Sequence, residues 1–296
     1  MKILVIYGGD GLSQEAEVSH RSGKSVLTML ETAGYTADGF VINSDNIAEL
    51  DNTLPNYDLV LPILHGTFGE DGQIQKILET HGVKYLGSDS VASALCFDKA
   101  LCKQKLTENY ILVPSGIIAK SVDDIRNIKL PAFAKPNHQG SGLGIIKINQ
   151  LDSDTVDEIN RAIKDFGELL VEEFIDGTEI SVGILGERPL PVAEIIPPNQ
   201  ELFTYENRYS GKSEEVVPSI NVTPELQARA QGIALAAHQA CNCHDWSRTD
   251  MIIRGSDIFV LEINTTPGMT EASLYPKMLV ASGLSIKDLI DQALSR

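Results

Sequence analysis

Basic residues are scarce in this sequence, and long apolar runs are missing from it. The 24 lysines and arginines are outnumbered by 41 aspartates and glutamates, which gives a formal net charge of −17. Because nucleic acids and anionic membranes select for basic surfaces, we expect neither as a partner. No apolar run of about 18 residues is present, and the first residues lack the pattern of a secretory signal, so we expect a cytoplasmic protein.

Cysteines are also few. Only four occur among 296 residues, which is too few for a disulfide framework in a chain of this size. Cys96 and Cys102 are predicted to be core residues. Zinc is considered for the segment 238–244, which contains Cys241 and Cys243. This segment has no CxxC pair and no visible partner pair elsewhere, so we predict no metal there.

Short apolar strands alternate with helices in the first third of the chain. Strands are predicted at 2–7 and 57–64, and they lead through glycine-containing segments into helices at 15–33 and 71–81. This alternation favours an α/β fold with a parallel sheet covered by helices. Beyond residue 88 the predicted elements are, in order, two short helices, strands at 132–135 and 145–148, a helix at 152–166, strands at 169–175, 180–185 and 191–196, a polar loop at 197–222, a helix at 224–241, and strands at 248–253 and 258–263.

A glycine-rich loop follows the first predicted strand. Gly8, Gly9 and Gly11 lie between this strand and the next helix, where backbone amides and a helix N-terminus can receive an anion. An ordinary tight turn between strand and helix explains the same residues. Glu15 comes just after the loop and is well placed to meet a ligand ammonium.

A second glycine-rich segment begins with a lysine. Lys135 ends a predicted strand, and Gly140, Gly142 and Gly144 follow it. Glycines let the backbone fold closely over phosphates, and the lysine offsets their charge. The segment is not a Walker loop, because the lysine precedes the glycines. The alternative is an ordinary hairpin.

Acidic residues end the predicted strand 169–175. Glu172 and Glu173 lie in it, and Glu179 follows a few residues later. The edge of such a strand can pair with an adenine through backbone groups, and a nearby carboxylate can accept from ribose hydroxyls. A solvated acidic loop is the alternative.

Two predicted strands near the C-terminus carry oxygen ligands. Asp250 lies in the first strand, and Glu262 and Asn264 lie in the second. Because side chains alternate along a strand, Glu262 and Asn264 point to the same face. A hairpin of the two strands would bring all three side chains together as a magnesium site. The alternative is a solvated or salt-bridged strand pair.

Taken in order, these motifs resemble those of the D-alanine–D-alanine ligase family within the ATP-grasp superfamily. The resemblance implies a three-domain α/β architecture, with an N-terminal parallel-sheet domain at 1–87, a central ATP-grasp subdomain at 88–177 and a C-terminal catalytic subdomain at 178–296. The residues that carry it are Gly8-Gly9, Ser13-Gln14-Glu15, Val18-Ser19, His65-Gly66, Gly69-Glu70-Asp71-Gly72, Gln75, Asp98-Lys99, Lys135-Pro136, Gly140-Ser141, Arg248-Thr249-Asp250, Glu262 to Thr270, and Ser273-Leu274.

The resemblance also implies a role for individual residues. It implies that ATP contacts Lys99, Lys135, Ser141, Glu173, Ile175, Glu179 and Arg208, and that two magnesium ions, or manganese, are bound by Asp250, Glu262 and Asn264. It implies that the first D-alanine contacts Glu15 and His65, and that the second contacts Ser273 and Leu274. It implies that Arg248 and the Gly268 amide face the tetrahedral carbon that forms during peptide-bond formation. It also implies that Tyr209 forms hydrogen bonds with Ser141 and Glu15, which close a mobile loop.

The implied activity is ATP-dependent ligation of two D-alanines through an acyl phosphate, for peptidoglycan precursors, by a homodimer. The sequence departs from the family pattern at Arg208, where lysine is usual, at Gly142, where a serine is usual, and in a slightly longer N-terminal glycine loop. Two other functions remain open. One is ligation of a different dipeptide by an ATP-grasp enzyme, and the other is nucleotide binding without catalysis.

Overall fold

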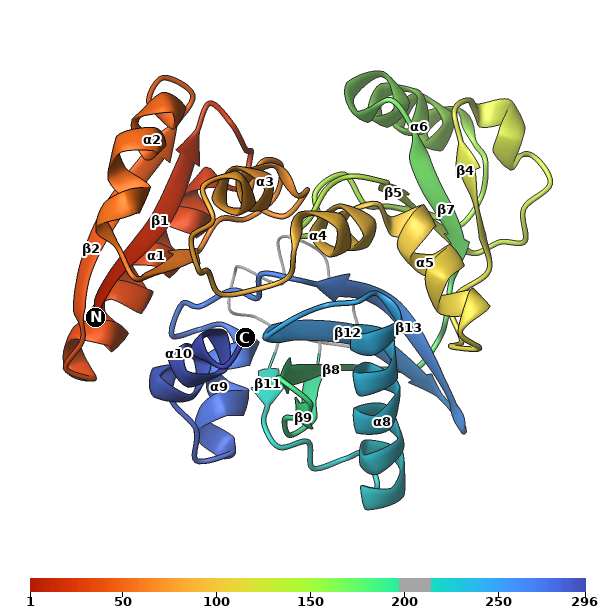
Figure 1. Cartoon of the computed structure of the whole chain (residues 1–296). Helices are drawn as coiled ribbons and strands as arrows, with labels where there is room; N and C mark the ends of the chain where they lie inside the picture. The colour runs from red at the N-terminus through yellow and green to blue at the C-terminus, as the bar shows by residue number, and fades with distance from the viewer. Residues whose placement is uncertain (197–213) are drawn as a thin grey trace.

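The computed structural model describes residues 1–196 and 214–296, and its strands form three sheets (Figure 1). In the N-terminal sheet, β1 (Lys2–Asp10) lies between β2 (Thr36–Asn43) and β3 (Leu59–Pro62), and both pairings are parallel. The expected parallel sheet is therefore confirmed. The sequence did not predict β2, because most of its residues are partly or fully exposed and form no apolar run.

Helices complete the N-terminal unit. The predicted helices are observed as α1 (Ala16–Thr32) and α3 (Gln73–Thr80). α1 buries Val26 and Leu30. The short elements between β2 and β3 are the 3-10 turns Ile47–Glu49 and Leu54–Asn56, which flank α2 (Leu50–Thr53).

The second sheet is antiparallel, in the order β4-β7-β5-β6. Ile159 and Ala162 of α6 are buried against its apolar face, with Ala134 and Val171. β4 was not predicted, because it is short and mostly exposed. The bounds are Gly116–Ala119 for β4, Ala132–Pro136 for β5, Ile146–Ile148 for β6, Leu169–Glu173 for β7, Ser153–Phe166 for α6 and Val122–Ile125 for a 3-10 turn.

The third sheet has the order β11-β10-β8-β12-β13, with β9 paired to β8. α8 packs on one face through Ala230 and Ala234, and Tyr275 of α9 meets the other face at Gly183. The bounds are Thr178–Leu185 for β8, Arg188–Pro189 for β9, Ala193–Ile196 for β10, Glu214–Val216 for β11, Trp246–Arg254 for β12, Asp257–Asn264 for β13, Pro224–Ala240 for α8, Leu274–Ala281 for α9 and Ile286–Leu294 for α10.

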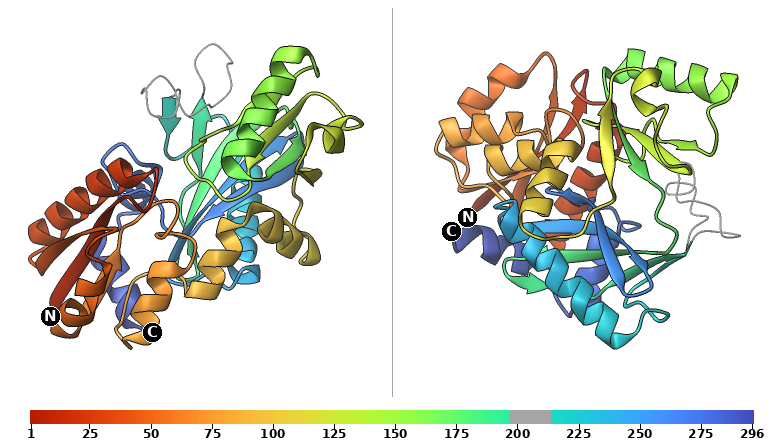
Figure 2. Two further views of the ribbon diagram at one scale, coloured as in Figure 1. Left: turned by 90° about the horizontal axis from the view of Figure 1, so that it is seen from above. Right: turned by 90° about the vertical axis from the view of Figure 1, so that its right-hand side faces the viewer.

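Two contacts between these units determine where the site forms. α9 and α10 share one apolar core with β1, through Met278, Leu289 and Val5. The helices α4 (Ser90–Phe97) and α5 (Lys99–Glu108) pack against β13 and α8. The N-terminal and central sheets consequently lie on opposite sides of the molecule, and the C-terminal sheet with its helices joins them (Figure 2). Among the helices in the described parts of the chain, none is long and apolar enough to cross a bilayer.

Candidate active site

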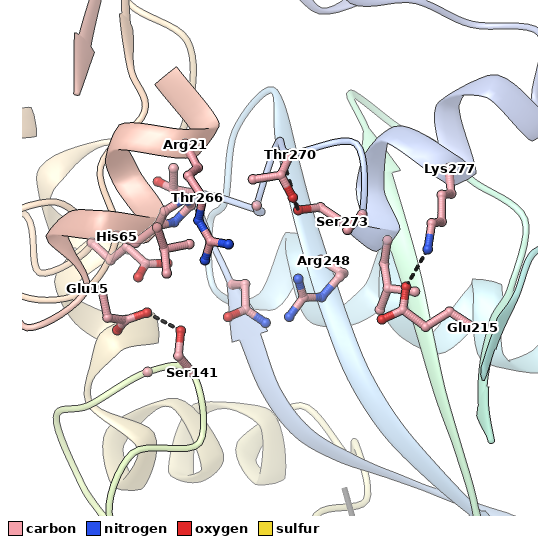
Figure 3. A pocket seen from close by; sticks show the side chains of 17 residues that line it. Glu15, Arg21, His65, Ser141, Glu215, Arg248, Thr266, Thr270, Ser273 and Lys277 are labelled. Carbon is pink, nitrogen blue, oxygen red and sulfur yellow. Dashed lines mark hydrogen bonds and ion pairs between the residues drawn. The ribbon is translucent and has the colours of Figure 1, made fainter. Parts of the chain in front are cut away.

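A pocket of about 380 Å³ opens where the three units meet (Figure 3). Pockets of this size suit small ligands. Eight residues that were assigned a role from the sequence line it, together with several that were not. The predicted lining residues are Glu15, His65, Ser141, Arg248, Asn264, Gly268, Ser273 and Leu274, and the others include Arg21, Glu70, Thr270, Glu215 and Lys277.

Glu15 directly precedes α1 and meets the loop after β5. The hydroxyl of Ser141 donates to Glu15 Oε2 across the pocket (Figure 3). Glu15 is 5% exposed, and glycines surround its carboxylate. A Cβ at Gly140 would lie 2.6 Å from Glu15 Oε1, and one at Gly66 would lie 2.9 Å from the same atom. Both glycines therefore leave the room that this carboxylate occupies.

His65 lies beside Glu15 and is neutral. Burial and the nearby Arg248 lower the pKa of His65 to about 4, although a hydrogen bond to the Thr266 backbone acts in the opposite direction. The ring Nε2 lies 3.1 Å from Ser22 Oγ, and the His65 amide donates to Ser19 Oγ at 2.9 Å. These bonds hold the imidazole in one orientation at the wall of the pocket.

Glu70 is a second acid at this end, and the sequence interpretation gave it no role. Burial, and then the neighbouring charge of Glu15, raise the pKa of Glu70 to about 8. Its Oε2 accepts from the Gly66 amide at 2.7 Å. Glu70 therefore carries a proton at neutral pH. A cation bound between the two acids would favour release of that proton.

The opposite end of the pocket is built on the N-terminus of α9. Ser273 is the N-cap residue and Leu274 begins the helix, so backbone amides and the helix dipole favour an anion there. Thr270 Oγ1 lies 2.8 Å from Ser273 Oγ. A Cβ at Gly268 would lie 2.9 Å from the same hydroxyl oxygen, so this close approach requires glycine.

Two cations that line the pocket were missed from the sequence. Lys277 lies in the first turn of α9 and pairs with Glu215 at 2.8 Å. Arg21 lies six residues after Glu15 in α1, with Val18 midway between them, and all three line the pocket. A spacing of three residues puts side chains on one side of a helix, and this was the signal that could have identified Arg21.

Arg248 and Asp250 form a bidentate ion pair in β12. The Arg248 Nε and NH2 groups each donate to the Asp250 carboxylate at 2.8 Å. Ser181 Oγ also donates to it, and Asn264 Nδ2 donates to Asp250 Oδ2 at 3.1 Å. The predicted antiparallel hairpin is confirmed, with Asp250 opposite Glu262 and Arg248 opposite Asn264.

These residues also fit a magnesium ion by their chemistry. Asp250, Glu262 and Asn264 bring two carboxylates and an amide oxygen to neighbouring positions of one hairpin. Such hard oxygen donors suit magnesium. In this structure Arg248 supplies positive charge to Asp250, and Lys99 lies 3.7 Å from Glu262. The negative charges of Asp250 and Glu262 are thus balanced by basic side chains in this structure, and a magnesium ion would balance them in the same way.

Lys99 and Lys135 come from different segments, and both act on Glu262. Lys99 begins α5 and its ammonium also donates to the Gln139 carbonyl. Lys135 lies on β5 and pairs with Glu172. Burial opposes the charged form of Lys135, but Glu172 and then Glu262 raise its pKa overall. The Lys135 ammonium therefore stays charged, and both lysines lie close to Glu262 of the C-terminal sheet.

Glu172 holds two buried lysines and was not assigned a role from the sequence. Its Oε1 lies 2.6 Å from Lys103 Nζ, while its Oε2 pairs with Lys135. Burial raises the pKa of Glu172, but Lys135 and Lys103 lower it overall. Burial also lowers the pKa of Lys103 to about 8. This triad fixes the direction of the Lys135 side chain.

The residues expected at the adenine and ribose end are Glu173, which ends β7, and Ile175 and Glu179, which follow it. The Glu173 amide donates to the Ser115 carbonyl at 2.9 Å, and its side chain accepts from the same residue. Ile175 is buried, and Glu179 is on β8, where its charge raises the pKa of Lys135. Arg208 and Tyr209 lie outside the residues that the structure describes.

The facing sheets define the class of protein. Lys135 comes from the central sheet and Glu262 from the C-terminal sheet, and a parallel-sheet domain adds Glu15, so the architecture is ATP-grasp with an N-terminal α/β domain. Residues 113–295 match the model of the D-ala D-ala ligase C-terminus, and residues 43–88 match that of the N-terminus. The chain belongs to the D-alanine–D-alanine ligase family.

Similar proteins cover the whole chain. The D-alanine–D-alanine ligase of Halalkalibacterium halodurans is 37% identical, over 98% of this chain and 97% of its own. That of Desulforudis audaxviator is 36% identical, over 98% and 96%. The crystal structure of the Bacillus anthracis ligase has a TM-score of 0.85 at 31% identity, over 100% and 96%.

Two further solved structures bear on the ligands. The Bacillus anthracis ligase complexed with ATP has a TM-score of 0.82 at 30% identity, and covers 100% of this chain and 96% of its own. The VanG D-Ala:D-Ser ligase from Enterococcus faecalis also has a TM-score of 0.82 at 30% identity, over 99% and 98%. Likeness in fold therefore does not distinguish the second amino acid.

Proposed function

We propose that this protein joins two D-alanines to D-alanyl-D-alanine at the expense of ATP, through an acyl phosphate. One observation carries the proposal: Glu15 and the N-terminus of α9 line the same small pocket. An acid at one end suits the ammonium of a first amino acid. Backbone amides, with Lys277 and Arg21, suit the carboxylate of a second.

In the first step the carboxylate of the first D-alanine attacks the γ-phosphate of ATP. A bond forms between carboxylate oxygen and phosphorus, and the bond to ADP breaks. Both reactants are anions, so positive charge must offset their repulsion. The ammonium groups of Lys99 and Lys135 supply it, and Glu172 orients Lys135.

In the second step the free amine of the second D-alanine attacks the acyl carbon. The amine loses a proton and phosphate leaves, which forms the peptide bond. Arg248 and Gly268 line the pocket, and the Arg248 guanidinium and the Gly268 amide would donate to the oxyanion. This role requires Arg248 to exchange its contact with Asp250 for one with the substrate.

Magnesium, when bound, offsets phosphate charge and orients the γ-phosphate for attack. Asp250, Glu262 and Asn264 would hold it, up to two ions, with manganese as a substitute. The Arg248–Asp250 pair supports this proposal, because a cation at Asp250 would replace the guanidinium and leave Arg248 for substrate.

The adenosine part of ATP extends toward the end of β7. We propose that backbone groups of Glu173 and Ile175 contact adenine and that Glu179 binds ribose. The nearness of Glu179 to Lys135 supports this, because the ribose must lie within reach of the phosphates. Ser141, Arg208 and Tyr209 would close over the phosphates and exclude water from the acyl phosphate.

Measuring ADP and dipeptide together tests this function. Purified protein is supplied with ATP, magnesium and one amino acid or a pair from D-alanine, D-serine, D-lactate and L-alanine. We expect one ADP per D-alanyl-D-alanine and no turnover with L-alanine. ADP formation only with another pair would favour a different ligase, and ATP binding without turnover on any pair would favour a non-catalytic relative.

D-serine is the competing second substrate. The likeness to the VanG D-Ala:D-Ser ligase supports its inclusion, since that structure matches this chain as fully as the ATP complex does. The sequence relatives quoted above are both D-alanine–D-alanine ligases. We therefore propose D-alanine as the preferred acceptor over D-serine, and D-lactate as a negligible one.

The broader setting belongs to the same proposal. A D-alanyl-D-alanine ligase supplies a precursor for peptidoglycan, so we propose a cytoplasmic role in cell-wall synthesis and cell shape. We also propose that the protein is a homodimer and that its domains span 1–87, 88–177 and 178–296. Size-exclusion chromatography with light scattering tests the dimer, and limited proteolysis at residues 87–90 and 176–179 tests the boundaries.

A further inference from the structure

All four cysteines of the chain come together in one buried cluster. Cys96 lies in α4 and Cys102 in α5, Cys241 is the C-cap residue of α8, and Cys243 follows two residues later. The Sγ atoms of Cys96 and Cys243 are 3.6 Å apart. Those of Cys96, Cys102 and Cys241 all lie within 4.8 Å of one another. Each cysteine is a free thiol and at most 6% exposed.

Packing alone is a weak explanation of this cluster. Cysteine does pack as a small apolar side chain, and these four belong to an apolar core with Leu106 and Val260. Any small apolar residue would serve that purpose at each position. Packing does not explain why all four of these neighbouring positions are cysteine, or why the chain has cysteine at these positions alone. Four adjacent thiols are a donor set that binds zinc.

The sulfur positions are close to those of a tetrathiolate site. Four sulfurs at about 2.3 Å from a central zinc lie about 3.8 Å from one another. The contact of 3.6 Å between Cys96 and Cys243 is near this value. The Sγ atoms of Cys96, Cys102 and Cys241 lie within 4.8 Å of one another. For all of these sulfurs to coordinate one ion, they would have to shift by distances on the order of 1 Å.

Two lysines of α5 lie beside the cluster. Lys103 follows Cys102 directly, and Lys105 lies two residues further along the same helix. These two lysines offset part of the negative charge that a metal tetrathiolate carries.

We propose that Cys96, Cys102, Cys241 and Cys243 form a structural site for one zinc ion. When zinc binds, each thiol that still holds a proton releases it to solvent, and a zinc–sulfur bond forms in its place. The step needs no oxidant or reductant. Four protein ligands leave no open position for a substrate, which is typical of structural zinc. The site is separate from the oxygen ligands on β12 and β13.

The cluster also bears on the active site through the chain between Cys96 and Cys102. Asp98 and Lys99 lie there, where α4 ends and α5 begins. Asp98 caps α5 by accepting from the Leu101 amide at 3.0 Å. An ion that ties both helices to the end of α8 would fix this bend, and with it the Lys99 ammonium beside the ATP cleft.

The sequence interpretation rejected zinc at 238–244 because no partner pair was visible. That reason was wrong, since the fold brings Cys96 and Cys102 to the end of α8. Their spacing of six residues across a helix junction is not a recognised zinc spacing. His244, which belongs to the same segment, instead lies 3.8 Å from Asp89.

Cobalt substitution tests the site directly. The full chain is purified under reducing, anaerobic conditions, stripped with a strong chelator, supplied with excess magnesium and titrated with cobalt(II). We expect one cobalt per chain with intense thiolate-to-cobalt charge-transfer bands, displaced by one equivalent of zinc(II). Zinc should also protect the four thiols of the folded protein from a thiol reagent. Absence of these bands, or equal thiol reactivity with and without zinc, would overturn the proposal.

Variants separate ligands from neighbours. We expect Cys102→Ser and Cys241→Ser to weaken cobalt binding by at least about 100-fold, because loss of a ligand exceeds the loss seen when only its supporting contacts are removed. The matched control is His244→Gln, which should bind cobalt like the unmodified protein. Circular dichroism shows whether each variant folds. A Cys96–Cys243 disulfide in the reduced preparation, or loss of the bands in His244→Gln, would also contradict a four-cysteine site.

Discussion

Ser141 and Glu15 are separated by 126 positions in the sequence, and the Ser141 hydroxyl donates to the Glu15 carboxylate. Ser141 holds this contact with a φ of 54°, in the left-handed region that residues other than glycine rarely adopt. The contact joins the loop after β5 to the start of α1. It therefore connects the ATP-grasp half of the site with the half that we propose binds the first D-alanine.

Removing the hydroxyl should weaken this connection. A hydrogen bond to a charged group contributes about 1.5–3 kcal/mol, so we expect Ser141→Ala to lower kcat/KM for D-alanine by roughly tenfold to a hundredfold. Steady-state kinetics at saturating ATP measures the change. Ser295→Ala is the control, because it removes an exposed hydroxyl outside the pocket. Equal kinetics for both variants would show that the contact does not matter for catalysis.

Glu172 should matter for stability as well as for ATP. Glu172→Gln leaves two buried ammonium groups without their anion, and breaking such a buried pair costs about 3–5 kcal/mol. We also expect a higher KM for ATP, because Lys135 loses its orientation. Urea unfolding and kinetics measure the two effects.

The adjacent acid provides the control for that change. Glu173 is half-buried and accepts from Ser115, so Glu173→Gln keeps an acceptor there. We expect it to cost less than about 1 kcal/mol. Similar losses for the two variants would contradict a specific role for the buried triad.

Glu262 should be essential for turnover. Glu262→Gln removes a negative charge from the proposed magnesium site, and we expect near-complete loss of ligation. The loss should persist at saturating ATP. Activity assays over a magnesium titration measure it, with circular dichroism to confirm folding. Near-normal turnover at ordinary magnesium would refute the assignment of Glu262 as a metal ligand.

Binding of D-alanine should release a proton from Glu70. The pKa of Glu70 is about 8, so at pH 7 the side chain is mostly protonated. An ammonium bound at Glu15 would lower this pKa and expel the proton. Calorimetry at pH 7 in two buffers of different ionisation enthalpy, with a non-hydrolysable ATP analogue present, measures the release. Glu70→Gln should abolish it, and unchanged release in that variant would refute the assignment.

The same group should make stability depend on pH. The pKa of Glu70 is raised in the folded state, so above the ordinary glutamate range the unfolded chain loses a proton that the folded chain keeps. This contribution opposes folding increasingly as the pH rises from about 5 to about 8. Glu70→Gln should therefore be more stable relative to the unmodified protein at pH 8 than at pH 5. A difference that is constant with pH would contradict the raised pKa.

Much of the fold could be predicted from the sequence because apolar runs and glycine punctuation are local signals. β1 and α6 follow such patterns closely. β2 and β4 could not be found, because edge strands bury few residues. α9 and α10 were also missed, although Ser285 and Asp288 form a capping box at the start of α10.

The candidate site was predictable where the motifs are compact. The pairing of β12 with β13 follows from two adjacent strands, so Asp250 and Glu262 could be placed together. Glu172 and Lys277 could not be recognised, because their partners Lys103 and Glu215 come from distant segments. A salt bridge between distant residues leaves no periodic signal in one sequence.

The central claim is that ATP activates the carboxylate of one D-alanine as an acyl phosphate. D-alanine labelled with oxygen-18 in its carboxylate tests this most directly, with inorganic phosphate and nucleotides analysed by mass spectrometry. We predict one labelled oxygen in the phosphate for each D-alanyl-D-alanine formed, together with ADP. Unlabelled phosphate, or the formation of AMP and pyrophosphate, would contradict the account.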